Sequence, residues 1–182
     1  MSRRKRTPDN AMVSAVKLTD LTDAPLTYTE VGATVHADRM PAGFHHVAAA
    51  RRVGSGRERF EAVADAVLRY GMLRGAGVRV AASTDSAEVG TVVLGRLGPF
   101  AAPCRVVYVL DEPNRRGFAY GTLPGHPVAG EERFSVRFDP ASESVYAEVA
   151  AFSRPRTWWA RLGSPALTAV QKLVTQRYLH AL

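Results

Sequence analysis

The residues best suited to chemistry lie close together between positions 117 and 134. A turn reading Pro124-Gly125-His126-Pro127 holds an imidazole, and two adjacent carboxylates, Glu131 and Glu132, follow it. The prolines fix the backbone on both sides of the histidine, which suits a group that must be held in one position. Imidazole and carboxyl groups serve enzymes as general acids and bases. The spacing makes His126 and Glu132 candidate catalytic residues.

Strand alternation separates the two carboxylates. Residues 132–138 alternate so that Glu132 shares a face with Phe134, while Glu131 takes the opposite face. If the phenylalanine face lines a cavity, burial would raise the pKa of Glu132 and suit it for proton transfer. The alternative is structural: Glu132 would satisfy backbone groups of the preceding turn or pair with a nearby arginine. His126 has a similar alternative, as a turn residue that hydrogen-bonds the following loop.

Seven further residues are candidate ligand contacts because their hydroxyl, carboxyl, imidazole or aromatic groups lie in the same strands or in nearby motifs. They are Tyr28, Glu30, His46, Tyr108, Tyr120, Thr122 and Phe134.

Other reactive residues carry weaker signals. Adjacent residues of an extended chain point apart, so His45 and His46 would rarely bind one metal ion, and we expect no metal site. Cys104 lacks a neighbouring base and reads as a buried, inert thiol. The sequence Gly54-Ser55-Gly56 precedes a helix, but Arg59 replaces the third glycine of the dinucleotide fingerprint. We therefore expect no cofactor.

Composition and charge narrow the class of protein. The 182 residues are enough for one domain with a sizeable core, and 46% of them are hydrophobic. No apolar run approaches the ~20 residues of a membrane helix, so a cytoplasmic location is the default expectation. Four charges of the net +7 come from residues 3–6. We read residues 1–20 as a disordered basic arm and residues 21–182 as one domain; contact of the arm with nucleic acid is a less favoured alternative.

The periodicity predicts a simple order of elements. Residues 26–31 alternate and predict a first strand, residues 32–54 an irregular connection, and residues 56–70 an amphipathic helix with a capping box at Ser55 and Glu58 and a stop at Gly71. Six more strands are predicted near residues 78–82, 91–94, 105–110, 118–122, 132–138 and 145–149. A long helix is predicted over residues 165–182, beginning at Pro165.

Short turns between successive strands imply an antiparallel meander. A sheet of about seven strands buries one face most economically by curling around the last helix. The expected class is therefore α+β, with a curved antiparallel sheet wrapped around a long C-terminal helix. Such an arrangement leaves room for an apolar cavity between sheet and helix.

The chain resembles the domain-of-unknown-function family numbered nineteen-ninety. The resemblance rests on Tyr28 to Thr34, Pro41 to His46, and above all on residues 105–108, 117–127 and 130–134. It covers residues 26–182 and implies a helix-grip fold of the birch-pollen-allergen and START type. The family has no activity to carry over.

Two functions follow. The first is the binding of a small apolar or amphipathic molecule in the cavity. The alternative is an acid–base enzyme of the cyclase, hydratase or dehydratase type, acting on a polyketide-, terpenoid- or lipid-like substrate, with Glu132 and His126 exchanging protons. The fold alone does not choose between them, and the oligomeric state stays open.

Overall fold

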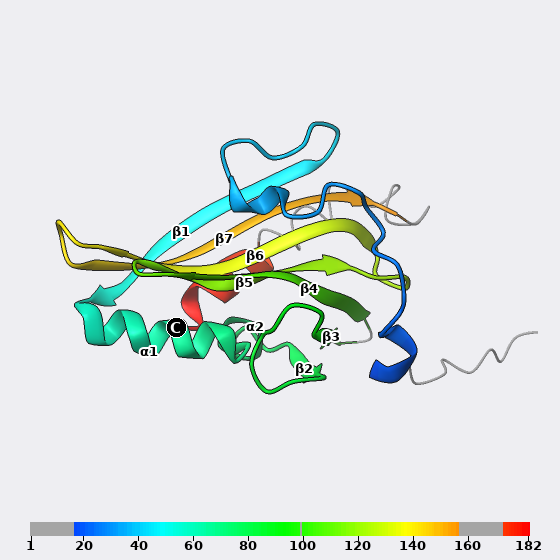
Figure 1. Ribbon diagram of the computed structural model, residues 1–182, viewed down its shortest axis with the longest axis horizontal. Coiled ribbons are helices and arrows are strands. Elements are labelled where there is room, and N and C mark those ends of the chain that lie inside the picture. Colours follow the sequence, from blue (N-terminus) through cyan, green and yellow to red (C-terminus); the bar gives the residue numbers. More distant parts are fainter. Residues whose placement is uncertain (1–16, 99, 157–172) are drawn as a thin grey trace, which may run out of the picture.

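A curved antiparallel sheet of seven strands forms the centre of the protein (Figure 1). The computed structural model describes residues 17–98, 100–156 and 173–182. The strands are β1 His45–Ser55, β2 Arg79–Ala82, β3 Val92–Leu97, β4 Phe100–Glu112, β5 Arg115–Thr122, β6 Val128–Asp139 and β7 Ser144–Pro155. They lie in the order β1-β7-β6-β5-β4-β3-β2. Strands β2 to β7 are therefore the expected meander, and β1 pairs with β7 at the far edge.

The strand pairing has two irregularities. The register shifts between Arg52 and Gly54 in the pairing of β1 with β7, and between Val106 and Tyr108 in the pairing of β4 with β5. An extra residue on one strand bends that strand and increases its local twist. These shifts help the sheet to curve around the elements on its concave side, which we call the inner face.

The inner face is covered by helices α1 Arg57–Leu68 and α2 Gly71–Gly75 and by the helical residues 173–180 (Figure 1). The predicted periodicity of the first helix is confirmed, since Phe60, Val63 and Val67 are fully buried against the sheet. The predicted capping box is wrong, because Gly56 is the N-cap and no side chain caps the helix. Gly71 does not end the helical region either; it begins α2 after a left-handed turn at Tyr70.

The predicted strand at 26–31 is wrong. These residues belong to a segment, residues 26–35, that crosses the opposite or outer face of the sheet and ends in the short 3-10 helix η2 Ala33–Val35; we call this segment the strap. The Thr27 N–H donates to the Thr122 carbonyl at 3.1 Å, without a strand ladder. The alternation that suggested a strand reflects anchoring instead, because Leu26 and Tyr28 are the residues directed into the protein.

Strand β1, which pairs with β7 at the sheet edge, lies almost entirely within residues 32–54, which were expected to form an irregular connection. In β1, residues 47–50 read Val-Ala-Ala-Ala, and alanine has low strand propensity, so the β signal was weak. Most of its residues are half-buried or exposed, as suits an edge strand. Its place in the fold comes from ladder pairing with β7 rather than from a hydrophobic pattern.

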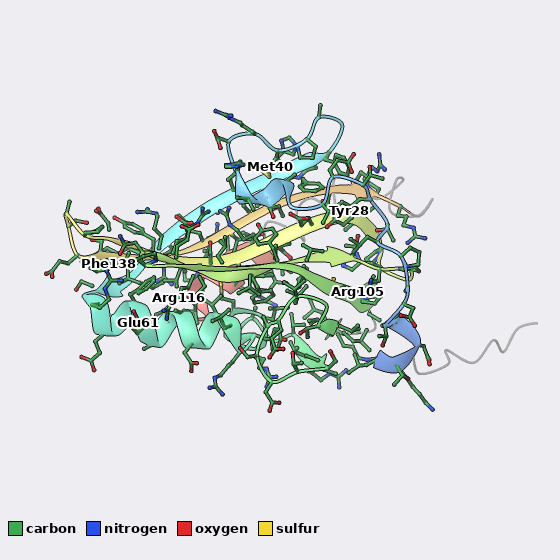
Figure 2. The ribbon with its side chains drawn as sticks, viewed as in Figure 1. Tyr28, Met40, Glu61, Arg105, Arg116 and Phe138 are labelled. Carbon is green, nitrogen blue, oxygen red and sulfur yellow. The ribbon has the colours of Figure 1, made fainter. Side chains whose placement is uncertain are left out.

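The ends of the described chain also pack on the sheet. Residues 18–20, assigned to the arm in the sequence, begin the 3-10 helix η1 Leu18–Leu21, and Leu21 is buried with Val92 and Leu123. Arg105 of β4 reaches this helix, since its Nη2 donates to the Leu21 carbonyl at 2.7 Å (Figure 2).

The long C-terminal helix is borne out only in part. Residues 173–180 are helical, whereas residues 165–172 of the predicted helix lie outside the described residues. The helical residues described do pack on the inner face, because the Tyr178 ring lies 5.1 Å from the Phe134 ring. Among the described residues, no helix is both long enough and apolar enough to cross a membrane.

Candidate functional site

Strand β6 directs its two adjacent carboxylates to opposite faces of the sheet, as the alternation predicts. Glu132 faces inward beside Phe134, which is fully buried in the core. Tyr120 of β5 is its cross-strand partner, and the Tyr120 hydroxyl donates to Oε2 of Glu132 at 3.0 Å. Among the described residues, this is the one side-chain hydrogen bond that Glu132 makes.

A pocket of about 180 Å³ opens beside this pair. Its walls come from β1, β4, β5, β6, β7, the β5–β6 turn and the C-terminal helical residues. The lining includes Tyr120, Thr122, His126, Glu132, Phe152 and Tyr178. The predicted candidates Tyr120, Thr122, His126 and Glu132 are thus brought together in one place.

Burial controls the protonation of Glu132. Desolvation raises the pKa of this carboxyl from 4.5 to about 7, and the hydrogen bond from Tyr120 opposes the rise. Among the described residues, no arginine, lysine or charged histidine contributes to the shift. The carboxyl is therefore close to half-ionised near neutral pH, as a proton donor and acceptor would need to be.

The phenols and the thiol around Glu132 stay protonated. Burial, followed by the nearby charge of Glu132, raises the pKa of Tyr120, Tyr178 and Cys104 well above their ordinary values. Tyr178 lines the pocket together with Tyr120 and Glu132. Cys104 is buried and reduced, in line with the inert thiol expected from the sequence.

His126 lies in the turn at the same pocket. Its Nδ1 is 3.1 Å from both the backbone nitrogen and the carbonyl oxygen of Val128, so the ring closes the turn as the structural alternative required. Burial, reinforced by the charge of Arg156, lowers the pKa of His126 to about 4, although the bond to Val128 opposes this. The imidazole is therefore neutral at physiological pH. No direct contact joins His126 to Glu132 among the described residues.

Glu131 occupies the outer face, where it binds the strap. Its Oε2 accepts from the Tyr28 hydroxyl and the Gly32 N–H, both at 2.7 Å. Its Oε1 accepts from the Thr34 N–H at 3.0 Å and also from the Thr34 hydroxyl. One buried carboxylate thus satisfies two side-chain hydroxyls and two backbone amides of the strap, which gives Glu131 a structural role.

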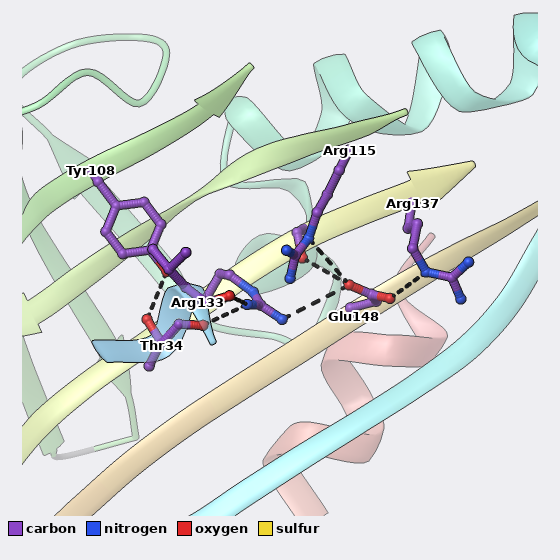
Figure 3. Close-up of polar contacts among 8 residues, drawn as sticks. Thr34, Tyr108, Arg115, Arg133, Arg137 and Glu148 are labelled. Carbon is purple, nitrogen blue, oxygen red and sulfur yellow. Dashed lines mark hydrogen bonds and ion pairs between the residues drawn. The ribbon is translucent and has the colours of Figure 1, made fainter. Parts of the chain in front are cut away.

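A charged network continues from the strap across the outer face (Figure 3). Arg133 is 3% exposed and donates from Nη1 to the carbonyls of Thr34 and Val35. Glu148 on β7 lies 2.8 Å from Arg137 Nε and 3.8 Å from Arg133 Nη2. Sequence reasoning missed this network because its members are far apart in the chain; the polar residues alternating with Phe134 were the one visible signal.

The remaining predicted ligand contacts do not line the pocket; Phe134 is fully buried in the core beside it. The Tyr28 hydroxyl binds Glu131 and the Tyr108 hydroxyl lies 2.7 Å from Thr34 Oγ1, both on the outer face. Glu30 accepts from the Thr29 N–H at 3.0 Å within the strap. His46 is exposed at the sheet edge, with Nε2 2.7 Å from the Pro41 carbonyl.

Metal-ligating groups do not gather anywhere in the described part of the chain. No three histidine, cysteine, aspartate or glutamate side chains there are placed to hold one metal ion.

Comparison with known proteins gives a family and a fold. The family described as "Domain of unknown function (DUF1990)" matches residues 27–181. A UPF0548 protein of Deinococcus radiodurans is 36% identical over 198 residues, spanning 97% of this chain and 95% of the relative. A UPF0548 protein of Arabidopsis thaliana is 34% identical over 130 residues, 66% of this chain and 62% of that protein. The crystal structure of the hypothetical protein jhp0584 from Helicobacter pylori superposes with a TM-score of 0.56 at 9% identity, covering 76% of this chain and 84% of that one.

Proposed function

Because the chain belongs to the DUF1990 family and shares its helix-grip arrangement, we propose that it binds a small, mainly apolar molecule in the pocket described above. Glu132 and Tyr120 hold the polar group of that molecule, and the aromatic and aliphatic lining holds its apolar body. The sheet supplies one wall and the C-terminal helical residues supply the other.

One observation carries this proposal: a carboxyl with unused hydrogen-bonding capacity faces an apolar pocket. A carboxylate has about four lone-pair positions, and Tyr120 occupies one of them. Buried polar groups in proteins are normally satisfied, so a ligand group is the natural partner for the rest. The volume of about 180 Å³ exceeds the roughly 150 Å³ of a cavity known to accept benzene. A molecule built on a single ring matches the described volume.

Blocking the pocket tests the proposal. We expect one-ring fragments to shift backbone amide signals of β5 and β6 in two-dimensional NMR spectra of the wild-type protein. Ala151→Leu fills the pocket from β7 and should abolish these shifts, because Ala151 lines it. Ala48→Leu adds the same atoms at an exposed position of β1 and should leave them unchanged. Equal binding by Ala151→Leu and wild type would place the ligand elsewhere.

A second candidate function is acid–base catalysis, which the pKa of about 7 at Glu132 favours. Glu132 would take or give a proton on a bound polyketide-, terpenoid- or lipid-like substrate, and the neutral His126 would accept or donate a hydrogen bond nearby. Glu132→Gln distinguishes the two functions. An enzyme would lose turnover while keeping affinity, whereas a binding protein has no turnover to lose.

A further inference from the structure

We infer that the preferred ligand of this pocket is cationic: a protonated amine on an aromatic or other apolar body, with its ammonium group paired to Glu132. This inference rests on the proposed function and names its ligand class.

The described lining of the pocket carries no permanent positive charge; Arg156, whose charge acts on His126, lies outside this lining. Arginine and lysine are absent from its described lining, and the ionisable side chains there are His126, Glu131, Glu132, and Tyr120 and Tyr178. Glu131 turns its carboxylate to the strap, and His126 is neutral. Glu132 is therefore the one carboxylate that the described residues direct into this space, and no cation among those residues pairs with it. A buried carboxylate without a counter-charge is costly, and an entering ammonium supplies that charge.

The hydrogen-bonding geometry leaves room for an ammonium donor. Oε2 of Glu132 accepts the Tyr120 hydroxyl, while Oε1 has no hydrogen-bond partner among the described residues. An ammonium group can donate to Oε1 without displacing any existing bond. A ligand carboxylate in the same place would meet the like charge of ionised Glu132.

The aromatic rings around Glu132 suit a cation as well. The Phe134 ring lies 5.3 Å from the Tyr120 ring and 5.1 Å from the Tyr178 ring, and both contacts are edge-on. Ring faces attract cations, most strongly where water is excluded. An ammonium ion paired with Glu132 would therefore also lie near the rings of Tyr120 and Tyr178, which line the pocket with it.

Binding of an amine must be linked to the proton on Glu132. The titratable groups around this carboxyl are Tyr120 from β5, Cys104 from β4, Tyr178 from the C-terminal helical residues and His126 from the β5–β6 turn. Between pH 6 and pH 8 the tyrosines, the cysteine and His126 all stay neutral, so Glu132 is the group whose charge changes. Its ionised fraction rises about tenfold over this range, and affinity for an amine rises with it.

Three probes with the same ring and different charge test the inference: benzylamine, benzyl alcohol and benzoate, titrated into labelled full-length protein at pH 6 and pH 8 by NMR. We expect benzylamine to bind at least fivefold more tightly than benzyl alcohol at pH 8, to weaken by about tenfold at pH 6, and benzoate to leave the pocket signals unchanged. The affinity for benzyl alcohol should vary less than twofold with pH. The pH comparison uses wild-type protein alone and so does not depend on the folding of a variant.

Substitution gives the second readout. Glu132→Gln should bind both benzylamine and benzyl alcohol with equal affinity, while Glu58→Gln, the same charge change on the exposed side of α1, should behave as wild type. Benzyl alcohol binding at least as tightly as benzylamine in the wild type, or an amine preference that survives Glu132→Gln, overturns the inference but leaves the proposed function standing. Absence of pocket shifts with all three probes overturns both.

Discussion

The cost of burying Glu132 can be measured through the pH dependence of folding. The folded protein holds the pKa of this carboxyl at about 7, against an ordinary value of 4.5. Between these two values the folded state binds more protons than the unfolded state, so the free energy of unfolding falls as pH rises. The contribution of Glu132 is therefore most favourable below pH 4.5 and is lost as pH passes 7. Glu132→Gln removes this dependence.

The magnitude follows from the two pKa values. Their difference of 7 − 4.5 = 2.5 corresponds to about 3 kcal/mol at 1.36 kcal/mol per pKa unit. Glu132 is only half-buried and borders the pocket, so solvent reduces the figure, and we expect about 1–3 kcal/mol. The free energy of unfolding of Glu132→Gln minus that of the wild type should therefore rise by this amount between pH 5 and pH 8.5.

The measurement is urea unfolding of both proteins at half-unit pH steps, followed by far-UV circular dichroism. Subtracting the two curves cancels every group that titrates equally in both proteins, including His126. The informative quantity is the change in the difference with pH, because a constant offset reports only the loss of the Tyr120 hydrogen bond to a carboxylate. A difference that stays flat from pH 5 to pH 8.5 would refute the claim that Glu132 is desolvated.

Three further predictions concern the turn, the outer face and the sheet. His126 is neutral in the folded state with a pKa of about 4, so the free energy of unfolding should fall as pH drops from 6.5 through 4. In urea titrations over this range, His126→Gln should lose about 1–3 kcal/mol less than the wild type. Equal loss in both proteins would contradict this prediction. Glu131→Ala leaves the amides of Gly32 and Thr34 without their acceptor, so unfolding should cost at least about 3 kcal/mol less and hydrogen exchange in residues 26–35 should accelerate; unchanged exchange there would contradict the anchoring role. Gly130→Ala places a Cβ against the Phe152 carbonyl at a φ of +155°, and should lower the free energy of unfolding by more than about 2 kcal/mol; a melting temperature within a degree of wild type would refute the close approach.

The elements with strong periodicity were predictable, and those held by long-range pairing were not. Strand β6 and helix α1 each carry a clear apolar repeat and lie where the sequence placed them. Strand β1 has no such repeat and is defined by its ladder with β7, about a hundred residues later. The strap carries a period of two but makes no ladder, so the same pattern served two different structures.

The candidate site likewise has a part that the sequence predicts and a part that depends on long-range pairing. Alternation within β6 was enough to direct Glu132 inward and Glu131 outward. The Tyr120 partner of Glu132 depends on the register between β5 and β6, which the short turn at 124–127 sets. Tyr28 and Tyr108 were expected at a ligand but lie on the outer face, because alternation gives no face for a residue outside a regular strand or beyond a bulge.

The attachment of the strap constrains the order of folding during synthesis. Tyr28, Gly32 and Thr34 bind a carboxylate 97 to 103 residues further along the chain. At synthesis rates of about 5–20 residues per second, the strap leaves the ribosome roughly 5–20 seconds before Glu131. The outer face of β6 also needs β5 and β7 beside it before it is rigid. The strap is therefore made early but is among the last segments to reach its final place, and until then its Tyr28 and Leu26 side chains remain open to chaperones and proteases.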